Sequence, residues 1–269
     1  MTAPSTRGRP VPPEPPFLGT RVEDADLDTA LRWLNRPALF RGRWGYPVKP
    51  AAGGRAPITG GRPAEAVLAE LVERCRREDL VQPGLVYGYF RCAGDGNDLA
   101  VQGPAGEERF RFRREAAEPR RCIADWFRPA DRGGDVVSLQ LVTAGHGLPR
   151  ALERANREGR YLEMLHLHGF ASALAEALAE WLHHRVRAEL GLAGGESGDP
   201  ADAFRHRYRG RRFSFGYPAC PDLAEQRTLF RLLEPDRIGV TLNASCQMVP
   251  EHSTSALVVH HQDAVQFAV

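Results

Sequence analysis

The chain has 269 residues, of which 42% are hydrophobic and 26% are charged, and its formal net charge is +2. This composition is typical of a globular protein, and so small a net charge gives no reason to expect nucleic-acid binding. No apolar run reaches the roughly 18 to 20 residues that span a bilayer, and the amino terminus is polar rather than signal-like. We therefore expect a cytoplasmic protein that neither crosses nor anchors to a membrane.

The first 20 residues are rich in proline and poor in apolar side chains, which predicts a disordered tail. The remainder, residues 21–269, is predicted to form one domain. Apolar residues at helical spacing between Leu27 and Leu34 predict its first helix. Pro63 is suited to the start of a second helix, because a first helical turn tolerates proline.

After Pro83 and Gly84 the apolar pattern changes to the alternation that is typical of strands. Glycine-rich turns separate the first three of these strands. The strands predicted in this part of the chain are residues 85–91, 98–101, 108–113, 122–126 and 136–142.

A helical pattern returns between residues 148 and 190, with Phe170 and Trp181 on one face. Asp199-Pro200 supplies a cap and a first residue for a short helix that ends near residue 208. Another helix is predicted between residues 222 and 234, followed by strands at 238–242, 255–260 and 265–269. This order of elements predicts an α+β fold, with a twisted, mostly antiparallel sheet flanked by helices.

One segment combines several chemical constraints: Arg211-Arg212-Phe213-Ser214-Phe215-Gly216-Tyr217-Pro218-Ala219-Cys220-Pro221-Asp222. Each proline fixes its own φ and biases the preceding residue toward an extended conformation, so the loop is stiff. Gly216 allows close approach of the backbone to a ligand, and an arginine at the loop entrance offers a planar fork for a carboxylate. Cys220 is either a thiol with a lowered pKa or, as we favour, a small buried residue that closes the turn.

This loop resembles the arginine-x-x-x-glycine-tyrosine-proline-alanine-cysteine-proline signature of the activation domain of cobalamin-dependent methionine synthase. Three other segments resemble the same family in the same order. Residues 123–129 are similar to its alanine-aspartate-phenylalanine-x-x-proline segment, residues 174–187 to its long helix, and residues 238–250 to its glycine-containing strand and the turn after it. The resemblance implies a domain that binds S-adenosylmethionine (AdoMet) and supports the reductive remethylation of oxidised cobalamin.

The resemblance also implies which residues hold AdoMet. The family arginine that contacts AdoMet corresponds to Arg212, which we expect to pair with the carboxylate of the ligand, while Asp125 pairs with its ammonium group. Glu176 corresponds to a helix glutamate that faces the ligand, and Gly216 lies in the binding loop. Tyr217 is expected to lie against the sulfonium or the cobalamin, where aromatic rings attract cations, and it is our candidate catalytic residue.

Alternative interpretations remain for each of these positions. Without the resemblance, the arginine is an ordinary surface residue, the aspartate a turn residue and the helix glutamate part of a solvated face. The tyrosine is equally well explained as a packing residue in a rigid turn. A tyrosine pair that contacts AdoMet in the family corresponds here to Gln266 and Phe267. Losing the first of these rings removes a stacking surface, which costs on the order of 1 kcal/mol or more.

No metal site is predicted. The histidine pairs His183-His184 and His260-His261 are adjacent in the sequence, so their side chains diverge by about 100° on a helix or point to opposite faces of a strand. There is no His-Glu-x-x-His run, and the five cysteines are widely spaced without a Cys-x-x-Cys pair.

Two functions are compatible with these observations. The first is a stand-alone reactivation subunit that binds AdoMet and supports reductive methylation of cob(II)alamin on a separate cobalamin-binding methionine synthase core. A flavodoxin-like protein would donate the electron. Such a methyltransferase subunit is inactive without its partner, since the chain has no Asp-x-His-x-x-Gly cobalamin motif. The alternative is a non-catalytic docking or regulatory protein for a corrinoid protein, with a degenerate AdoMet pocket.

Overall fold

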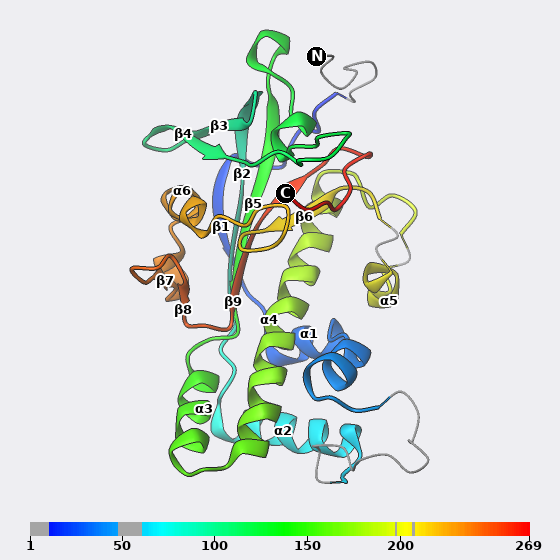
Figure 1. The fold of residues 1–269 in the computed structure, drawn as a ribbon, viewed down its shortest axis with the longest axis vertical. Coiled ribbons are helices and arrows are strands. Elements are labelled where there is room, and N and C mark those ends of the chain that lie inside the picture. The colour runs from blue at the N-terminus through cyan, green and yellow to red at the C-terminus, as the bar shows by residue number, and fades with distance from the viewer. Residues whose placement is uncertain (1–10, 48–60, 197, 206–207) are drawn as a thin grey trace.

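An antiparallel sheet with a long helix, α4, along one face forms the centre of the molecule (Figure 1). The computed structural model describes residues 11–47, 61–196, 198–205 and 208–269. The strand order is β4-β3-β2-β5-β9-β6, and β1 pairs with a further part of β2. The strands of this sheet are β1 (Gly19–Glu23), β2 (Gly84–Asp95), β3 (Asp98–Gly103), β4 (Gly106–Arg111), β5 (Asp135–Thr143), β6 (Arg211–Ser214) and β9 (Ser253–Val259).

Helices lie on both faces of this sheet, which confirms the predicted α+β class (Figure 1). The α-helices are α1 (Leu27–Arg32), α2 (Ala64–Glu78), α3 (Gly147–Arg157), α4 (Tyr161–Glu189), α5 (Pro200–Phe204) and α6 (Gln226–Leu233). Shorter helical turns are η1 (Ala38–Arg43), η2 (Ile123–Trp126), η3 (Ala130–Arg132), η4 (Leu223–Glu225) and η5 (Pro235–Ile238). The two-residue strands β7 (Thr241–Leu242) and β8 (Met248–Val249) pair separately. No helix in the described part of the chain is long and apolar enough to cross a membrane.

Strand β2 divides its side chains between two hydrophobic cores. Leu85, Tyr87 and Tyr89 belong to the core on the α4 side. Val86 and Phe90, in the alternate positions, belong to the core on the opposite side. Because helices cover both faces, every residue of the neighbouring strand β5 is buried.

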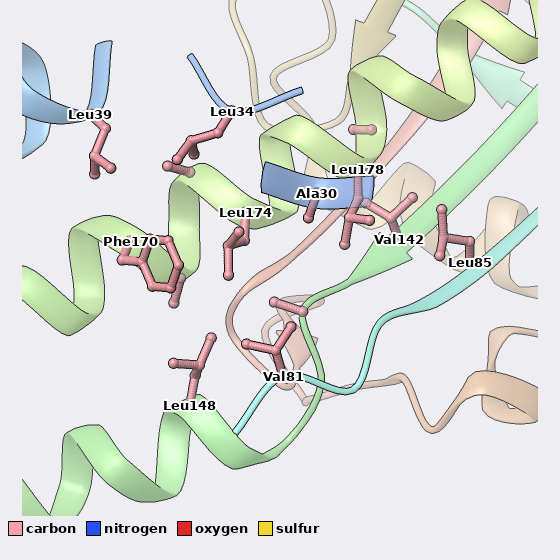
Figure 2. Close-up of a cluster of buried hydrophobic side chains, with 14 of the residues drawn as sticks. Ala30, Leu34, Leu39, Val81, Leu85, Val142, Leu148, Phe170, Leu174 and Leu178 are labelled. Carbon is pink, nitrogen blue, oxygen red and sulfur yellow. The ribbon is translucent and has the colours of Figure 1, made fainter. Parts of the chain in front are cut away.

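The core on the α4 side joins the helices to the sheet (Figure 2). Phe170, Leu174 and Leu178 follow one another at i, i+4 spacing on α4 and are fully buried. Ala30 of α1 and Val142 of β5 belong to the same cluster (Figure 2). This packing fixes the rotation of α4 about its axis, and with it the direction of the polar side chains on its other face.

A tryptophan locks η1 against α4. The Trp44 ring is 1% exposed, and its indole N–H donates a hydrogen bond of 3.1 Å to the carbonyl oxygen of His166. A Cβ atom at Gly169 would lie 2.8 Å from the Trp44 ring, so only glycine admits the indole this close to the helix.

The second core lies between the sheet, α6 and η2. Phe110 of β4, Phe213 of β6 and Leu257 of β9 are buried there together with Leu229 of α6. Trp126 of η2 packs against this cluster, with its ring stacked on that of Phe213 at a centroid distance of 5.4 Å. The segment around Asp125 is therefore held beside the edge strand β6.

Four sequence predictions of secondary structure are wrong. In the strand predicted at residues 238–242, Ile238 ends the turn η5 and only Thr241–Leu242 pair, as β7. Residues 122–126 form the turn η2 instead of a strand, because the Asp125 carboxylate accepts a hydrogen bond from the Cys122 N–H and closes the turn. Residues 265–269 form no strand. Instead, the Gln266 side-chain amide donates a hydrogen bond to the Arg212 carbonyl oxygen at the edge of β6. The helix predicted from 148 to 190 is two helices, which separate at Gly159, whose φ is +67°.

The two ends of the prediction also need adjustment. Ordered structure begins earlier than residue 21, because β1 starts at Gly19, and the ring of Phe17 lies 5.1 Å from that of Tyr89. The pairing of β1 with β2 and the ring of Phe17 together hold this segment to the sheet. Residues 1–10, in the predicted tail, and residues 206–207, in the helix predicted to end near 208, lie outside the described residues.

Candidate functional site

Arg212, on the edge strand β6, is the centre of a cluster of charged and polar side chains. One of its Nη atoms lies 3.3 Å from a Glu176 oxygen and 3.4 Å from a Glu180 oxygen, and both glutamates belong to α4. The other Nη donates to the Ser214 hydroxyl at 3.3 Å. The Arg212 side chain is only 14% exposed, so its charge is held in place by two carboxylates one helical turn apart.

Tyr217 completes this cluster from the loop that follows β6. Its hydroxyl donates a hydrogen bond of 2.9 Å to the second oxygen of Glu176. The negative charge of Glu176, followed by burial, raises the pKa of Tyr217, so this phenol stays protonated at neutral pH. The residue is 52% exposed, which leaves a large part of it open to a ligand or a partner.

The loop itself is a tight turn held by backbone hydrogen bonds. Gly216 N–H donates to the Cys220 carbonyl at 2.8 Å, and Cys220 N–H donates to the Tyr217 carbonyl at 2.8 Å. Gly216 has a φ of +86°, a conformation that side chains disfavour. Cys220 is 3% exposed, and burial raises its pKa to about 12. This confirms the interpretation of the cysteine as a small buried residue rather than a reactive thiol.

A second layer of charge supports Arg212 from inside the protein. Burial by itself would raise the pKa of Glu180, but the neighbouring His183 and the guanidinium groups of Arg212 and Arg187 lower it to about 2. Glu180 is therefore ionised at neutral pH. Arg187 is fully buried in turn, and it pairs with Glu196.

Asp125 lies in a different ion pair. Its two carboxylate oxygens accept hydrogen bonds from both Nη atoms of Arg114, at 2.6 and 2.8 Å, and the Cys122 N–H donates to it at 2.9 Å. Phe213, next to Arg212, points to the face of β6 that carries η2, so Arg212 points to the α4 face. The two charges of the expected clamp thus approach the edge strand β6 from opposite faces.

The carboxyl-terminal residues Gln266 and Phe267 border the same strand. The Gln266 amide donates a hydrogen bond of 2.9 Å to the Arg212 carbonyl. Phe267 is 9% exposed, with its ring 5.6 Å from that of Trp126 and 6.0 Å from that of Phe213. Both residues therefore support β6, the strand that carries Arg212.

The predicted residues Glu176, Arg212, Tyr217 and Gln266 are thus joined by contacts, and Gly216 shapes the loop between them. Sequence reasoning did not assign Glu180 as a partner of Arg212. The sequence feature that could have identified Glu180 is its i, i+4 spacing from Glu176 on a helix. A cavity of about 220 Å³ lies beside these side chains, with a lining that includes Trp33, Arg43, Glu176, Glu180, Phe204 and Arg212.

Comparison with known proteins identifies the family. Residues 63–269 match the family model described as the activation domain of vitamin B12 dependent methionine synthase. The chain belongs to this family. The activation domain is 38% identical over 281 residues to a methionine synthase of Mycobacterium tuberculosis (strain ATCC 25618 / H37Rv) and 37% identical to one of Mycobacterium leprae (strain TN). Each match covers 96% of this chain and 23% of the relative, so the chain spans about a quarter of the length of these synthases.

A solved structure shows the same fold. The MetH reactivation domain bound to AdoHcy superposes on this activation domain with a TM-score of 0.82 and 25% sequence identity. The superposition covers 96% of this chain and 83% of the other. The resemblance inferred from the loop and the helix is therefore confirmed over nearly the whole chain.

Proposed function

We propose that this activation domain binds AdoMet around Arg212 and acts as a separate subunit in the cytoplasm. There it would support the reductive methylation of cob(II)alamin on a cobalamin-carrying methionine synthase core. The observation that carries the proposal is the convergence of Arg212, Glu176 and Tyr217, from three different segments, in a fold whose relative was solved with AdoHcy bound. A cytoplasmic place agrees with five buried cysteines that form no disulfide.

The charges around β6 suit the amino-acid end of AdoMet. Arg212 would take the carboxylate of the ligand, which then replaces Glu176 as its partner. Asp125 does not line the cavity beside Arg212: it lies on the opposite face of β6, beyond the stacked rings of Trp126 and Phe213, where both Nη atoms of Arg114 pair with it. The predicted pairing of Asp125 with the ammonium group is therefore not part of this proposal.

The remaining residues position the ligand. Sites for drug-sized molecules have volumes of about 300–1,000 Å³. The cavity beside Arg212, of about 220 Å³, therefore suits only the amino-acid end, and the rest of AdoMet would lie along the Gly216 loop. Before the ligand binds, Glu176 contacts both the Arg212 guanidinium and the Tyr217 hydroxyl, and after the ligand carboxylate has replaced it at Arg212 it would still position the Tyr217 ring. The exposed part of that ring would then lie between the ligand and the corrin of the partner.

In the proposed step the reacting groups are those of AdoMet and cobalamin. When bound, AdoMet supplies a methyl group that leaves its sulfonium as a cation equivalent and bonds to cob(I)alamin, which provides the electron pair, so that AdoHcy and methylcobalamin result. A flavodoxin-like protein is proposed to supply the electron that reduces cob(II)alamin beforehand. The protein contributes orientation of the reactants and exclusion of water.

One observation favours the second candidate function, a non-catalytic docking or regulatory protein for a corrinoid protein. Gln266 bonds to the Arg212 carbonyl and Phe267 is packed into the core, so neither presents an aromatic ring to the ligand. If these positions decide affinity, the pocket is degenerate and the domain would bind the corrinoid partner without AdoMet.

Reconstitution separates the two functions. A cobalamin-carrying methionine synthase core without its own activation domain is mixed with this protein, reduced flavodoxin and AdoMet, and methylcobalamin is followed by absorbance. We expect methylcobalamin with the wild-type protein and at least a tenfold lower rate with Arg212→Ala, while Arg157→Ala, on an exposed part of α3, matches wild type. Binding of the core without any methylcobalamin would leave only the docking function.

A further inference from the structure

A second cluster of potential ligand groups lies apart from the AdoMet site. His168 is on α4, whereas Glu251 and His252 are in the connection between β8 and β9. One donor atom from each of these three side chains lies within 4.8 Å of the other two. His168 Nε2 is 3.6 Å from a Glu251 oxygen, and the His168 and His252 rings are 5.1 Å apart.

His252 is the unusual member of this cluster. The residue is only 4% exposed, yet among the described residues neither of its ring nitrogens has a hydrogen-bond partner. Buried polar atoms of folded proteins are nearly always paired, so an imidazole left in this condition needs an explanation. Its backbone is fixed, because the His252 carbonyl accepts a hydrogen bond of 3.0 Å from the Ala144 N–H beside the sheet.

We propose that His168, Glu251 and His252 bind a divalent transition-metal ion of the Zn²⁺ type. Two imidazoles and one carboxylate form a ligand set found in zinc sites with three protein ligands and an open fourth position. The absence of a thiolate from the cluster disfavours soft ions such as Cu(I). A bound ion would give the buried His252 nitrogen the partner that the protein does not supply.

Closing this site requires only small side-chain movements. Metal–nitrogen bonds of about 2.0–2.1 Å bring tetrahedral ligand atoms to roughly 3.3 Å from one another. The His168 and Glu251 side chains are 52% and 75% exposed, so both are free to rotate toward the fixed His252. The buried histidine thus sets the position of the ion and the two exposed residues close around it.

The charges near the cluster act in both directions. Burial is the largest influence on His252 and lowers its pKa to about 4, so the ring is neutral at pH 7 and keeps the lone pair that a metal needs. The positive charge of Arg43, on η1, lowers this pKa further and also opposes a cation. The carboxylate of Glu251 raises it and offsets that charge.

The cluster is separate from the proposed AdoMet site, although Arg43 lines the AdoMet cavity and its charge also acts on His252. His168 precedes Glu176 by eight residues on the same helix, a separation of about 12 Å along its axis. Glu251 and His252 precede β9, and Arg212 pairs with Val258 near the other end of that strand. Removing an exposed member of the cluster should therefore leave AdoMet binding unchanged.

Metal titration of the untagged 269-residue chain tests the proposal. Zn²⁺ binding is measured by calorimetry and Co²⁺ binding by visible absorption, which reports coordination geometry. The variants are His168→Ala and Glu251→Gln, both at exposed positions, so that folding is preserved. The matched control is His146→Ala, which removes an exposed histidine from the start of α3.

We expect one Zn²⁺ per chain with a micromolar or tighter Kd and a low-coordinate Co²⁺ spectrum. The affinity should fall about tenfold or more in His168→Ala and in Glu251→Gln, and it should match wild type in His146→Ala. The proposal would be overturned if neither ion bound stoichiometrically, or if the affinity were unchanged in both the His168→Ala and the Glu251→Gln variants. Calorimetry with AdoMet on the same variants checks that the other site is intact.

Discussion

At the scale of single residues, the site is built from side chains that satisfy one another without a ligand. Glu176 accepts from both Arg212 and Tyr217, and Glu180 keeps a second negative charge against the same guanidinium. A ligand carboxylate that enters must therefore displace Glu176, while Glu180 remains in place. This exchange keeps Arg212 paired with a carboxylate before and after binding, which limits the cost of burying its charge.

Tyr217 offers a test of what its ring contributes. Tyr217→Phe loses one hydrogen bond to Glu176 but keeps the ring, so the AdoMet affinity should fall by no more than about threefold. Tyr217→Ala also loses the aromatic face, and the affinity should fall about tenfold because cation–π contacts contribute roughly 0.5–2 kcal/mol. Calorimetry on the two variants provides the comparison. Wild-type affinity in Tyr217→Ala would show that the ring does not touch the ligand.

At the scale of elements, α4 organises both the core and the site. Its apolar face follows from the spacing of Phe170, Leu174 and Leu178, which the sequence alone makes plain. The i, i+4 pair of glutamates beside that face was also visible in the sequence. The contact of both glutamates with Arg212 could not be seen in the sequence, because it depends on how β6 pairs with β9 beneath the helix.

The error at η2 has a similar cause. The apolar pattern of residues 122–126 suits a strand equally well, and only the contacts of Asp125 with Arg114 and the Cys122 N–H decide for a turn. Arg114 follows β4 and so reaches Asp125 through tertiary folding. The family motif could therefore only suggest Asp125 as a site residue, and the sequence could not supply its partner Arg114.

The contact between Trp44 and α4 gives a prediction about stability. Gly169→Ala gains about 1 kcal/mol of helix propensity, but its methyl group overlaps a buried indole that a hydrogen bond holds in place. We expect a net loss of about 1–2 kcal/mol in the free energy of unfolding, measured by urea denaturation. Gly194→Ala is the control, because a Cβ there meets nothing within 4 Å. A Gly169→Ala variant as stable as wild type would contradict the tight contact.

At the scale of the whole molecule, two cores enclose the sheet, and buried histidines make the fold sensitive to acid. His183 is fully buried, and burial lowers its pKa to about 4, so its folded form is neutral. The pKa of His183 in the unfolded chain is about 6.5, so below this pH the unfolded chain binds a proton at His183 that the folded chain does not bind. The free energy of unfolding should therefore fall as the pH drops from about 6.5 to 4.

This loss is expected to reach roughly 3 kcal/mol for His183 in metal-free protein, as measured by urea denaturation at several pH values. The His183→Gln variant cannot take up this proton, so its free energy of unfolding should depend less steeply on pH in this window. His146→Gln, at an exposed position, should keep the wild-type dependence. An unchanged slope in His183→Gln would show that this histidine is not held neutral by the fold.

Arg212 is proposed to bind the amino-acid end of AdoMet, and a calorimetric cycle tests this role most directly. AdoMet and 5′-methylthioadenosine, which lacks the amino-acid end, are titrated into wild type and Arg212→Gln. A charge-assisted hydrogen bond contributes about 1.5–3 kcal/mol, so AdoMet should bind at least about tenfold more weakly to the variant. The affinity for methylthioadenosine should stay within about twofold. Equal AdoMet affinity in both proteins, or equal losses for both ligands, would contradict the account.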